Sequence, residues 1–242
     1  MTATPTFPDL KPMPGLPMPG LPMPGLPMSG LVLDGLTLSL AGRAILRLSL
    51  RVEPGEIVSV MGPSGSGKSS MLAAICGTLD PAFQMAGEIR LDGRRIDVEP
   101  PELRRTGILF QDDLLFPHLS VGGNLAFGLA ATVRGRKARR SCVEEALSAA
   151  DLEGFADRDP ATLSGGQRAR VSLLRVLLSQ PRAVLLDEPF SKLDMALRSR
   201  FRAFVFHELR SRALPALLAT HDHEDAKAAG GKVIELVFPE AI

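Results

Sequence analysis

The fold is decided by the stretch Gly62-Pro63-Ser64-Gly65-Ser66-Gly67-Lys68-Ser69-Ser70. Its first eight residues match the pattern G-x-x-x-x-G-K-[ST], which binds phosphate when it joins a strand to a helix. The glycines allow successive backbone N–H groups to point inward as an anion nest, and the helix N-terminus adds partial positive charge. Lys68 can reach the β- and γ-phosphates, and the Ser69 hydroxyl can ligate Mg²⁺. The stretch therefore predicts a site for ATP and Mg²⁺ lined by residues 62–70.

Apolar runs on both sides of this loop predict the elements that hold it. Residues 56–61 predict a buried strand that enters the loop, and residues 67–77 predict a helix that leaves it. The apolar runs 183–187 and 215–220 are continuous, as is typical of strands buried in a parallel sheet. Residues 87–93 alternate and end in Asp-Gly, which predicts an antiparallel hairpin. We therefore predict an α/β fold with a P-loop (RecA-like) nucleotide-binding core, an antiparallel β portion and an inserted helical subdomain.

The chain divides into a repeat tail and one globular domain. Residues 1–30 hold nine of the twenty prolines and a repeated pentapeptide, Leu-Pro-Met-Pro-Gly. Because proline removes amide donors and fixes φ, we expect a tail rich in polyproline II and turns, without a role of its own; a docking ligand for an aromatic groove is the alternative. Residues 31–242 form the predicted ATP-binding domain, in which alternating leucines up to Leu40 indicate short half-buried strands. A helical subdomain covers about residues 112–165, and its Ser141 and Glu144 match a capping box.

Composition excludes several classes of protein. The formal net charge is +1, which argues against a nucleic-acid-binding protein. The two cysteines, Cys76 and Cys142, are too few for a disulfide framework, so we expect small core residues in a reducing compartment. No apolar run reaches about 18 residues, so the sequence predicts no transmembrane helix, and action at a membrane requires a partner.

Two carboxylates end one of the buried strands. Asp187 and Glu188 close the run Val184-Leu-Leu-Asp-Glu188, and an acidic residue at that end of a strand lies beside the phosphate loop in such folds. We expect Asp187 to hold Mg²⁺, directly or through water, and Glu188 to polarise the attacking water. The alternative is that a strand-end carboxylate only caps the next element.

The pentapeptide Leu163-Ser-Gly-Gly-Gln167 narrows the class further. Ser164 can cap a helix whose open, donor-rich start suits an anion. The polar side chains of that helix form one stripe, made of Arg168, Ser172, Arg175 and Ser179. Placed between a phosphate loop and an acidic strand end, the pentapeptide makes the chain resemble the ATP-binding subunit of an ATP-binding cassette (ABC) transporter over about residues 31–238. The resemblance implies a homodimer, in which Ser164, Gly165, Gly166 and Gln167 of one copy cover ATP bound at Lys68 of the other.

Further positions match the same family in order along the chain. Gln111 resembles the Q-loop glutamine, which in the family senses Mg²⁺ and water and couples to the membrane subunit. Ser191-Lys-Leu-Asp194 resembles the D-loop, and Asp194 is kept while Lys192 departs from the usual alanine. His221 matches the switch histidine, which the family uses to contact the γ-phosphate. The resemblance thus implies catalytic roles for Glu188, His221 and Gln111, with Mg²⁺ at Ser69, Gln111 and Asp187.

One departure from the family pattern concerns the residue that contacts the adenine base. The family usually has an aromatic near position 39 or 40 to stack on adenine, and this chain has Ser39 and Leu40. The sequence contains no Trp and no Tyr, and no aromatic lies between Phe7 and Phe83. Only aliphatic contact with adenine is therefore predicted.

The segment from Leu109 to Gly128 resembles importers that use a separate binding protein, such as those for iron, thiamine, sulfate and polyamines. The resemblance implies a transmembrane permease subunit and a solute-binding protein as partners, and a peripheral position on the cytoplasmic face of the membrane. The chain stops at Ile242, so we expect no C-terminal regulatory domain. The alternatives are the ATPase of an exporter or lipoprotein-release system, and a soluble ABC ATPase without a transport role.

Overall fold

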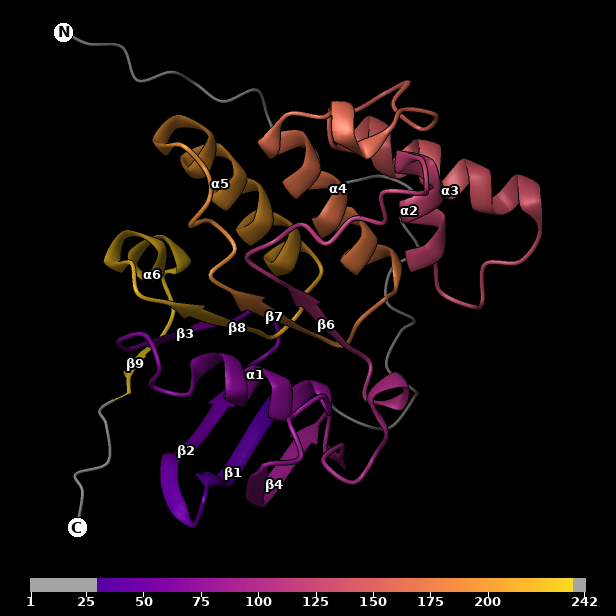
Figure 1. Cartoon of the computed structure of the whole chain (residues 1–242). Helices are drawn as coiled ribbons and strands as arrows, with labels where there is room; N and C mark the ends of the chain where they lie inside the picture. Colours follow the sequence, from indigo (N-terminus) through magenta and orange to yellow (C-terminus); the bar gives the residue numbers. More distant parts are fainter. Residues whose placement is uncertain (1–29, 237–242) are drawn as a thin grey trace, which may run out of the picture.

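The fold is built on an antiparallel β-sheet and a parallel β-sheet (Figure 1). The computed structural model describes residues 30–236, so the predicted tail lies outside the described residues except for Gly30. In this range an antiparallel sheet has the strand order β2-β1-β4-β5, and a parallel sheet has the order β6-β7-β8-β3-β9. The strands are β1 (Leu31–Leu40), β2 (Arg43–Val52), β3 (Ile57–Met61), β4 (Phe83–Leu91), β5 (Arg94–Arg95), β6 (Thr106–Leu109), β7 (Ala183–Asp187), β8 (Ala216–Thr220) and β9 (Val233–Glu235). The predicted α/β fold, with a parallel core and an antiparallel portion, is confirmed.

Helices fill the space between the sheets and cover the outer face of the parallel sheet. The α-helices within residues 30–236 are α1 (Lys68–Cys76), α2 (Val121–Gly128), α3 (Arg136–Ala149), α4 (Gly165–Leu178), α5 (Met195–Ser211) and α6 (His223–Ala229). Figure 1 shows α1 between the two sheets, α4 and α5 above the parallel sheet, and α2 and α3 beside α4. Two apolar cores result, one under α4 and α5 and one around α1. Cys76 and Cys142 are free thiols that pack in or against these cores.

The antiparallel sheet is larger than the sequence pattern predicts. Instead of short strands, β1 is a single ten-residue strand paired on both sides, with a register shift between Leu33 and Leu36. Across the shift, Gly35 has φ +59°, and a Cβ added at Gly87 of β4 would lie 2.5 Å from the Gly35 carbonyl oxygen. Glycine at this crossing lets β4 continue past the shift. The predicted hairpin at 87–93 is confirmed, but its first strand starts earlier, at Phe83.

The predicted start of a helix at Ser141 is wrong. Helix α3 begins at Arg136 after Gly135, so Ser141 lies inside it, and its hydroxyl donates to Glu145 Oε1 at 2.7 Å. Residues 136–140 are arginine, lysine and alanine, which favour a helix strongly, so the helix extends toward the N-terminus past the apparent capping box. The apolar residues Val143, Ala146, Leu147 and Ala150 share one face of the helix, and all four are buried.

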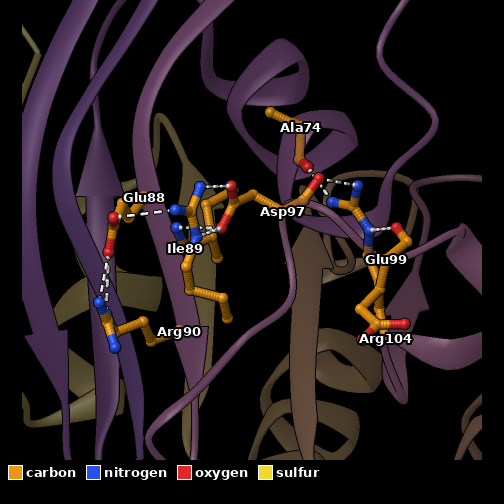
Figure 2. A network of polar contacts seen from close by, with 8 residues as sticks. Ala74, Glu88, Ile89, Arg90, Asp97, Glu99 and Arg104 are labelled. Carbon is orange, nitrogen blue, oxygen red and sulfur yellow. Dashed lines mark hydrogen bonds and ion pairs between the residues drawn. The ribbon is translucent and has the colours of Figure 1, made fainter.

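One buried arginine fixes the end of α1 that lies away from the phosphate loop (Figure 2). Arg104 is only 7% exposed, and its Nη1 donates to the carbonyls of Ala74 at 2.7 Å and Ile75 at 3.1 Å in the last turn of α1. Its Nε and Nη2 donate to the carbonyls of Glu99 and Asp97 at 2.7 and 3.0 Å. A cation here supplies charged donors to carbonyls of the last helical turn and complements the helix dipole. Arg104 thereby ties α1 to the segment that follows β5.

Candidate active site

The predicted phosphate loop lies between β3 and α1. Gly65 and Gly67 have φ of +82° and +88°, and Gly67 caps α1, so the loop turns in a conformation that favours glycine. Lys68 is 6% exposed, and its Nζ donates to the carbonyls of Gly62 at 2.6 Å and Pro63 at 3.0 Å. The buried Ser66 hydroxyl has no hydrogen-bond partner among the described residues. The first turn of α1 carries no acidic side chain, so the helix N-terminus keeps its positive potential.

The predicted magnesium ligands Ser69 and Asp187 lie together. The Ser69 hydroxyl donates to Asp187 Oδ1 at 3.2 Å, although the two residues are 118 positions apart. Burial raises the pKa of the Asp187 carboxyl, the bond from Ser69 and the charge of Lys68 oppose this rise, and Glu188 adds to it. Hydroxyl and carboxylate oxygens are donors that Mg²⁺ accepts, together with phosphate oxygens. In the range 30–236, no group of three or more His, Cys, Asp or Glu side chains forms a separate metal site.

Glu188 and His221 form a pair next to these residues. Because β7 and β8 are parallel neighbours, the residues after their ends meet, and the Glu188 amide donates to the Ala219 carbonyl at 3.0 Å. His221 Nδ1 lies 3.1 Å from Glu188 Oε1. Glu188 has φ +46°, an uncommon backbone conformation for a side chain of this size. A carboxylate and an imidazole held in this way can position a water molecule and a phosphate oxygen.

The Ser-Gly-Gly start of α4 has the predicted capped geometry. The Ser164 hydroxyl accepts from the Gln167 amide at 3.3 Å, and the Gln167 side chain accepts from the Ser164 amide at 2.9 Å, which completes a capping box. A Cβ at Gly166 would lie 2.5 Å from Leu197 Cδ1, so a larger residue there would require the Leu197 side chain on α5 to move. Asp194 caps α5 by accepting from the Leu197 amide at 3.0 Å. The structure therefore brings residues 164–167 beside the loop that ends at Asp194.

The site residues thus fall into two groups. The first contains residues 62–70 with Asp187, Glu188 and His221, and the second contains residues 164–167 with Asp194. Among the interactions of residues 30–236, no hydrogen bond or ion pair joins residues 164–167 to the phosphate loop. The first group gathers phosphate-loop donors, two carboxylates and an imidazole within one copy of the chain, whereas the second lies at the capped start of α4, apart from the phosphate loop.

The loop that carries Gln111 packs against α4 and the loop before Asp194, on the side of the second group. Asp112, directly after Gln111, forms an ion pair with Lys192 in the loop before Asp194. Asp113 lies 3.3 Å from the Nε atom of Arg168 on α4, and burial raises the pKa of this carboxyl. Two more members of the predicted polar stripe face the same loop, because Ser172 donates to the Asp113 carbonyl at 3.0 Å and Arg175 donates to the Leu114 carbonyl at 2.8 Å. The fourth member, Ser179, instead donates to the Val176 carbonyl of its own helix.

The pair of Asp112 and Lys192 is a feature that the sequence patterns did not reveal. Lys192 is a departure from the D-loop pattern, and that departure is the only signal in the sequence. The structure gives it a partner 80 positions away.

An apolar groove lies beside the Gln111 loop, between β6, α2 and α4. Its volume is about 870 Å³, and its lining includes Phe110, Leu114, Phe116, Phe127 and Arg175. Phe127 is 69% exposed and Leu114 is 54% exposed. The rings of Phe116 and Phe127 meet edge to face at 4.8 Å, and the Arg175 guanidinium lies 5.4 Å from the centre of the Phe116 ring. Exposed aromatic rings around a groove are typical of a protein–protein contact site.

Comparison with known proteins agrees with this geometry. The family model described as ABC transporter matches residues 45–191. An uncharacterized ABC transporter ATP-binding protein, YnjD of Escherichia coli K12, is 52% identical over 186 residues, which are 77% of this chain and 85% of the relative. A dimeric ATP-binding cassette, MJ0796, in a post-hydrolysis state with ADP and Pi, is 30% identical with a TM-score of 0.71, over 85% of this chain and 94% of that one.

Two import proteins match over a similar range. The spermidine/putrescine import ATP-binding protein PotA of Oleidesulfovibrio alaskensis is 38% identical over 79% of this chain. The Fe(3+) ions import ATP-binding protein FbpC of Streptomyces avermitilis is 41% identical over 82% of this chain. The chain spans only about half the length of these two relatives, 50% and 57%.

The chain belongs to the ABC transporter family, as an ATP-binding and ATP-hydrolysing subunit. The predicted resemblance to this family is confirmed, as is the resemblance to the polyamine and iron import group. No helix in the described part of the chain is both long and apolar enough to cross a membrane.

Proposed function

We propose that the chain hydrolyses ATP at its first group of site residues to drive solute import through a separate membrane subunit. The contact between Glu188 and His221, next to Ser69 and Asp187, carries this proposal. Glu188 polarises the attacking water, and His221 contacts the γ-phosphate. Lys68 neutralises the β- and γ-phosphates, while the loop amides and the N-terminus of α1 bind their oxygens.

Mg²⁺ fits the same place. Ser69 and Asp187 would hold it, with Gln111 from the neighbouring loop, and their oxygen donors suit a hard cation. The ion would supply positive charge between the phosphates. The residues themselves orient the phosphates and keep the attacking water on the Glu188 side.

We further propose that two copies close on ATP. The capped start of α4 presents free amides, and the structurally similar cassette is dimeric. Ser164, Gly165, Gly166 and Gln167 of one copy would cover ATP on the Lys68 loop of the other, which makes closure depend on ATP. Asp194, beside them, lies at the same interface.

The groove beside Gln111 is the proposed docking site of the transmembrane permease. Its exposed aromatic rings suit a partner segment with apolar side chains, and its rim contains the loop that also reaches Lys192. Docking there places the chain on the cytoplasmic face of the membrane as a peripheral subunit. The likeness to PotA and FbpC supports import with a solute-binding protein.

ATP turnover by the purified chain tests the catalytic proposal. His221→Ala should lower kcat by about 100-fold or more, within the range for a lost catalytic group. His223→Ala is the matched control, because His223 is exposed two residues further on, at the start of α6, and should leave kcat unchanged. Equal effects of the two variants would contradict the proposed role of His221.

A further inference from the structure

A row of three side chains crosses the end of the antiparallel sheet. Leu40, the last residue of β1, pairs directly with Arg43 of β2 on one side and with Phe83 of β4 on the other. Directly opposite residues of antiparallel strands project to the same face, with Cβ atoms about 4.5–5.5 Å apart. Arg43, Leu40 and Phe83 therefore form one continuous row of a cationic, an aliphatic and an aromatic side chain.

This row lies next to the phosphate loop. Side chains alternate along a strand, so Leu40 shares its face with Leu38, which is fully buried and pairs with Leu46. A Cβ added at Gly67 of the phosphate loop would lie 3.7 Å from Leu46 Cβ. The phosphate loop therefore packs against the pair of Leu38 and Leu46. The row of Arg43, Leu40 and Phe83 lies two residues, about 7 Å, further along β1.

Phe83 belongs to this row and does not pack against the apolar core around α1. In the part of the chain that the structure describes, the half-buried apolar side chains packed against the core around α1 are Ile45, Leu79, Met85, Ile108 and Ile234, and Phe83 is not among them. Leu40 beside it is 39% exposed. Figure 1 shows the start of β4 alongside the end of β1, at the edge of the sheet away from α3.

We propose that Phe83 contacts the adenine ring of the bound nucleotide. This inference rests on the proposed function. Leu40 is one of the two positions, 39 and 40, where an aromatic is expected, and the register of β4 places the aromatic Phe83 directly opposite it on the neighbouring strand. A base that extends from the phosphate loop along this face meets Leu40 first, with the Phe83 ring on one flank and the Arg43 guanidinium on the other. Aromatic rings and guanidinium groups both favour the face or edge of a planar base.

Calorimetric titration with ADP and with inorganic pyrophosphate tests this inference, because ADP is not hydrolysed and pyrophosphate lacks the base. Phe83→Ala should weaken ADP binding by roughly 5- to 150-fold, the range for loss of one stacked aromatic. Pyrophosphate should bind the variant and the unaltered chain equally. Phe83→Tyr should keep the ADP affinity, since the aromatic face remains.

Two controls make the outcome decisive. Val98→Ala shortens an apolar side chain that is 69% exposed and lies outside every proposed site, and it should change neither titration. If Phe83→Ala does not fold, Phe83→Leu keeps an apolar side chain but removes the ring, and it should also lose ADP affinity. An unchanged ADP affinity in a folded Phe83 variant would overturn the inference. A failure of the proposed function is distinct, because then neither ADP nor pyrophosphate would bind the unaltered chain.

Discussion

The phosphate loop and the row of Arg43, Leu40 and Phe83 are neighbours in space that are built in different ways. The loop is one contiguous stretch, and its conformation follows from glycines and from the helix that it starts. The row draws one residue from each of three strands, and it depends on how β1 pairs with β4 and with β2, whose register shifts between Leu38 and Ser39 directly before the row. A contiguous motif survives small shifts of the surrounding structure, whereas a row of this kind is lost with a one-residue slip.

The largest effect is expected at the part of the nucleotide site that holds the phosphates. Glu188→Gln keeps the size of the side chain but removes the charge that polarises water, so turnover should fall by about 10²- to 10⁴-fold. Binding of ADP should stay within about twofold, because Glu188 is not placed near the base. Parallel measurements of kcat and of ADP affinity check this. A variant that lost ADP affinity and turnover together would mean that Glu188 supports the loop rather than the chemistry.

A second test concerns α1, the helix that starts at the phosphate loop, at the far end where Arg104 holds it. Arg104→Leu leaves the carbonyls of Ala74 and Ile75 without their charged donor in a buried place, so the free energy of unfolding should fall by about 2–4 kcal/mol. Chemical denaturation measures this change. Arg90→Leu, from the same network in Figure 2, is the matched control, because the Arg90 side chain is 44% exposed and, within residues 30–236, forms an ion pair only with Glu88. It should cost less than about 1 kcal/mol. Equal losses would show that Arg104 contributes no more than a surface pair.

The contrast between the phosphate loop and the row of three side chains also explains which features could be predicted from the sequence. Residues 62–70, the acidic end of β7 and the capped start of α4 were all predicted from local patterns, because each pattern and its structure occupy the same few residues. The contact between Ser69 and Asp187 followed from the rule that parallel strands end at one edge of a sheet.

Other features depend on register and on distant partners. The sequence shows that an aromatic is missing at Ser39 and Leu40. It does not show that Phe83 lies opposite Leu40, because β4 was expected to start at residue 87. The pair of Asp112 and Lys192 joins two loops whose separation depends on the packing of α4 against α5. The capping box at Ser141 was predicted wrongly because helix propensity further upstream outweighed it.

A moderate effect is expected at the base end. Leu40→Tyr adds a ring to the row beside Phe83, and nucleotide binding should tighten by about 3- to 10-fold, less than a full stacking contribution because Phe83 already provides a ring. Since stacking tolerates any base, the unaltered chain should distinguish ADP from GDP by less than about fivefold. Titrations with both nucleotides on both proteins check this. A strong preference for ADP with no gain in Leu40→Tyr would indicate hydrogen bonds to the base from another element.

The smallest effect concerns the ion pair that joins the Gln111 loop to the loop before Asp194. Lys192→Ala removes an ion pair whose side chains are both more than half exposed, so the unfolding free energy should change by only about 0.2–1 kcal/mol. Exchange of the two charges in Asp112→Lys with Lys192→Asp should restore most of this difference. A double-mutant cycle by denaturation at low and high salt measures the coupling. A coupling free energy of zero at low salt would show that the two loops are independent.

The most direct measurement is a crystal structure of Glu188→Gln with ATP and Mg²⁺. We predict the triphosphate on the loop of Lys68, the cation between Ser69 and Asp187, and the adenine over Leu40 with the ring of Phe83 in contact. Ser164 and Gly166 of a second copy should cover the γ-phosphate. A triphosphate elsewhere, or a base turned away from the row of Arg43, Leu40 and Phe83 onto another part of the chain, would contradict the account of a single nucleotide site with two differently built ends.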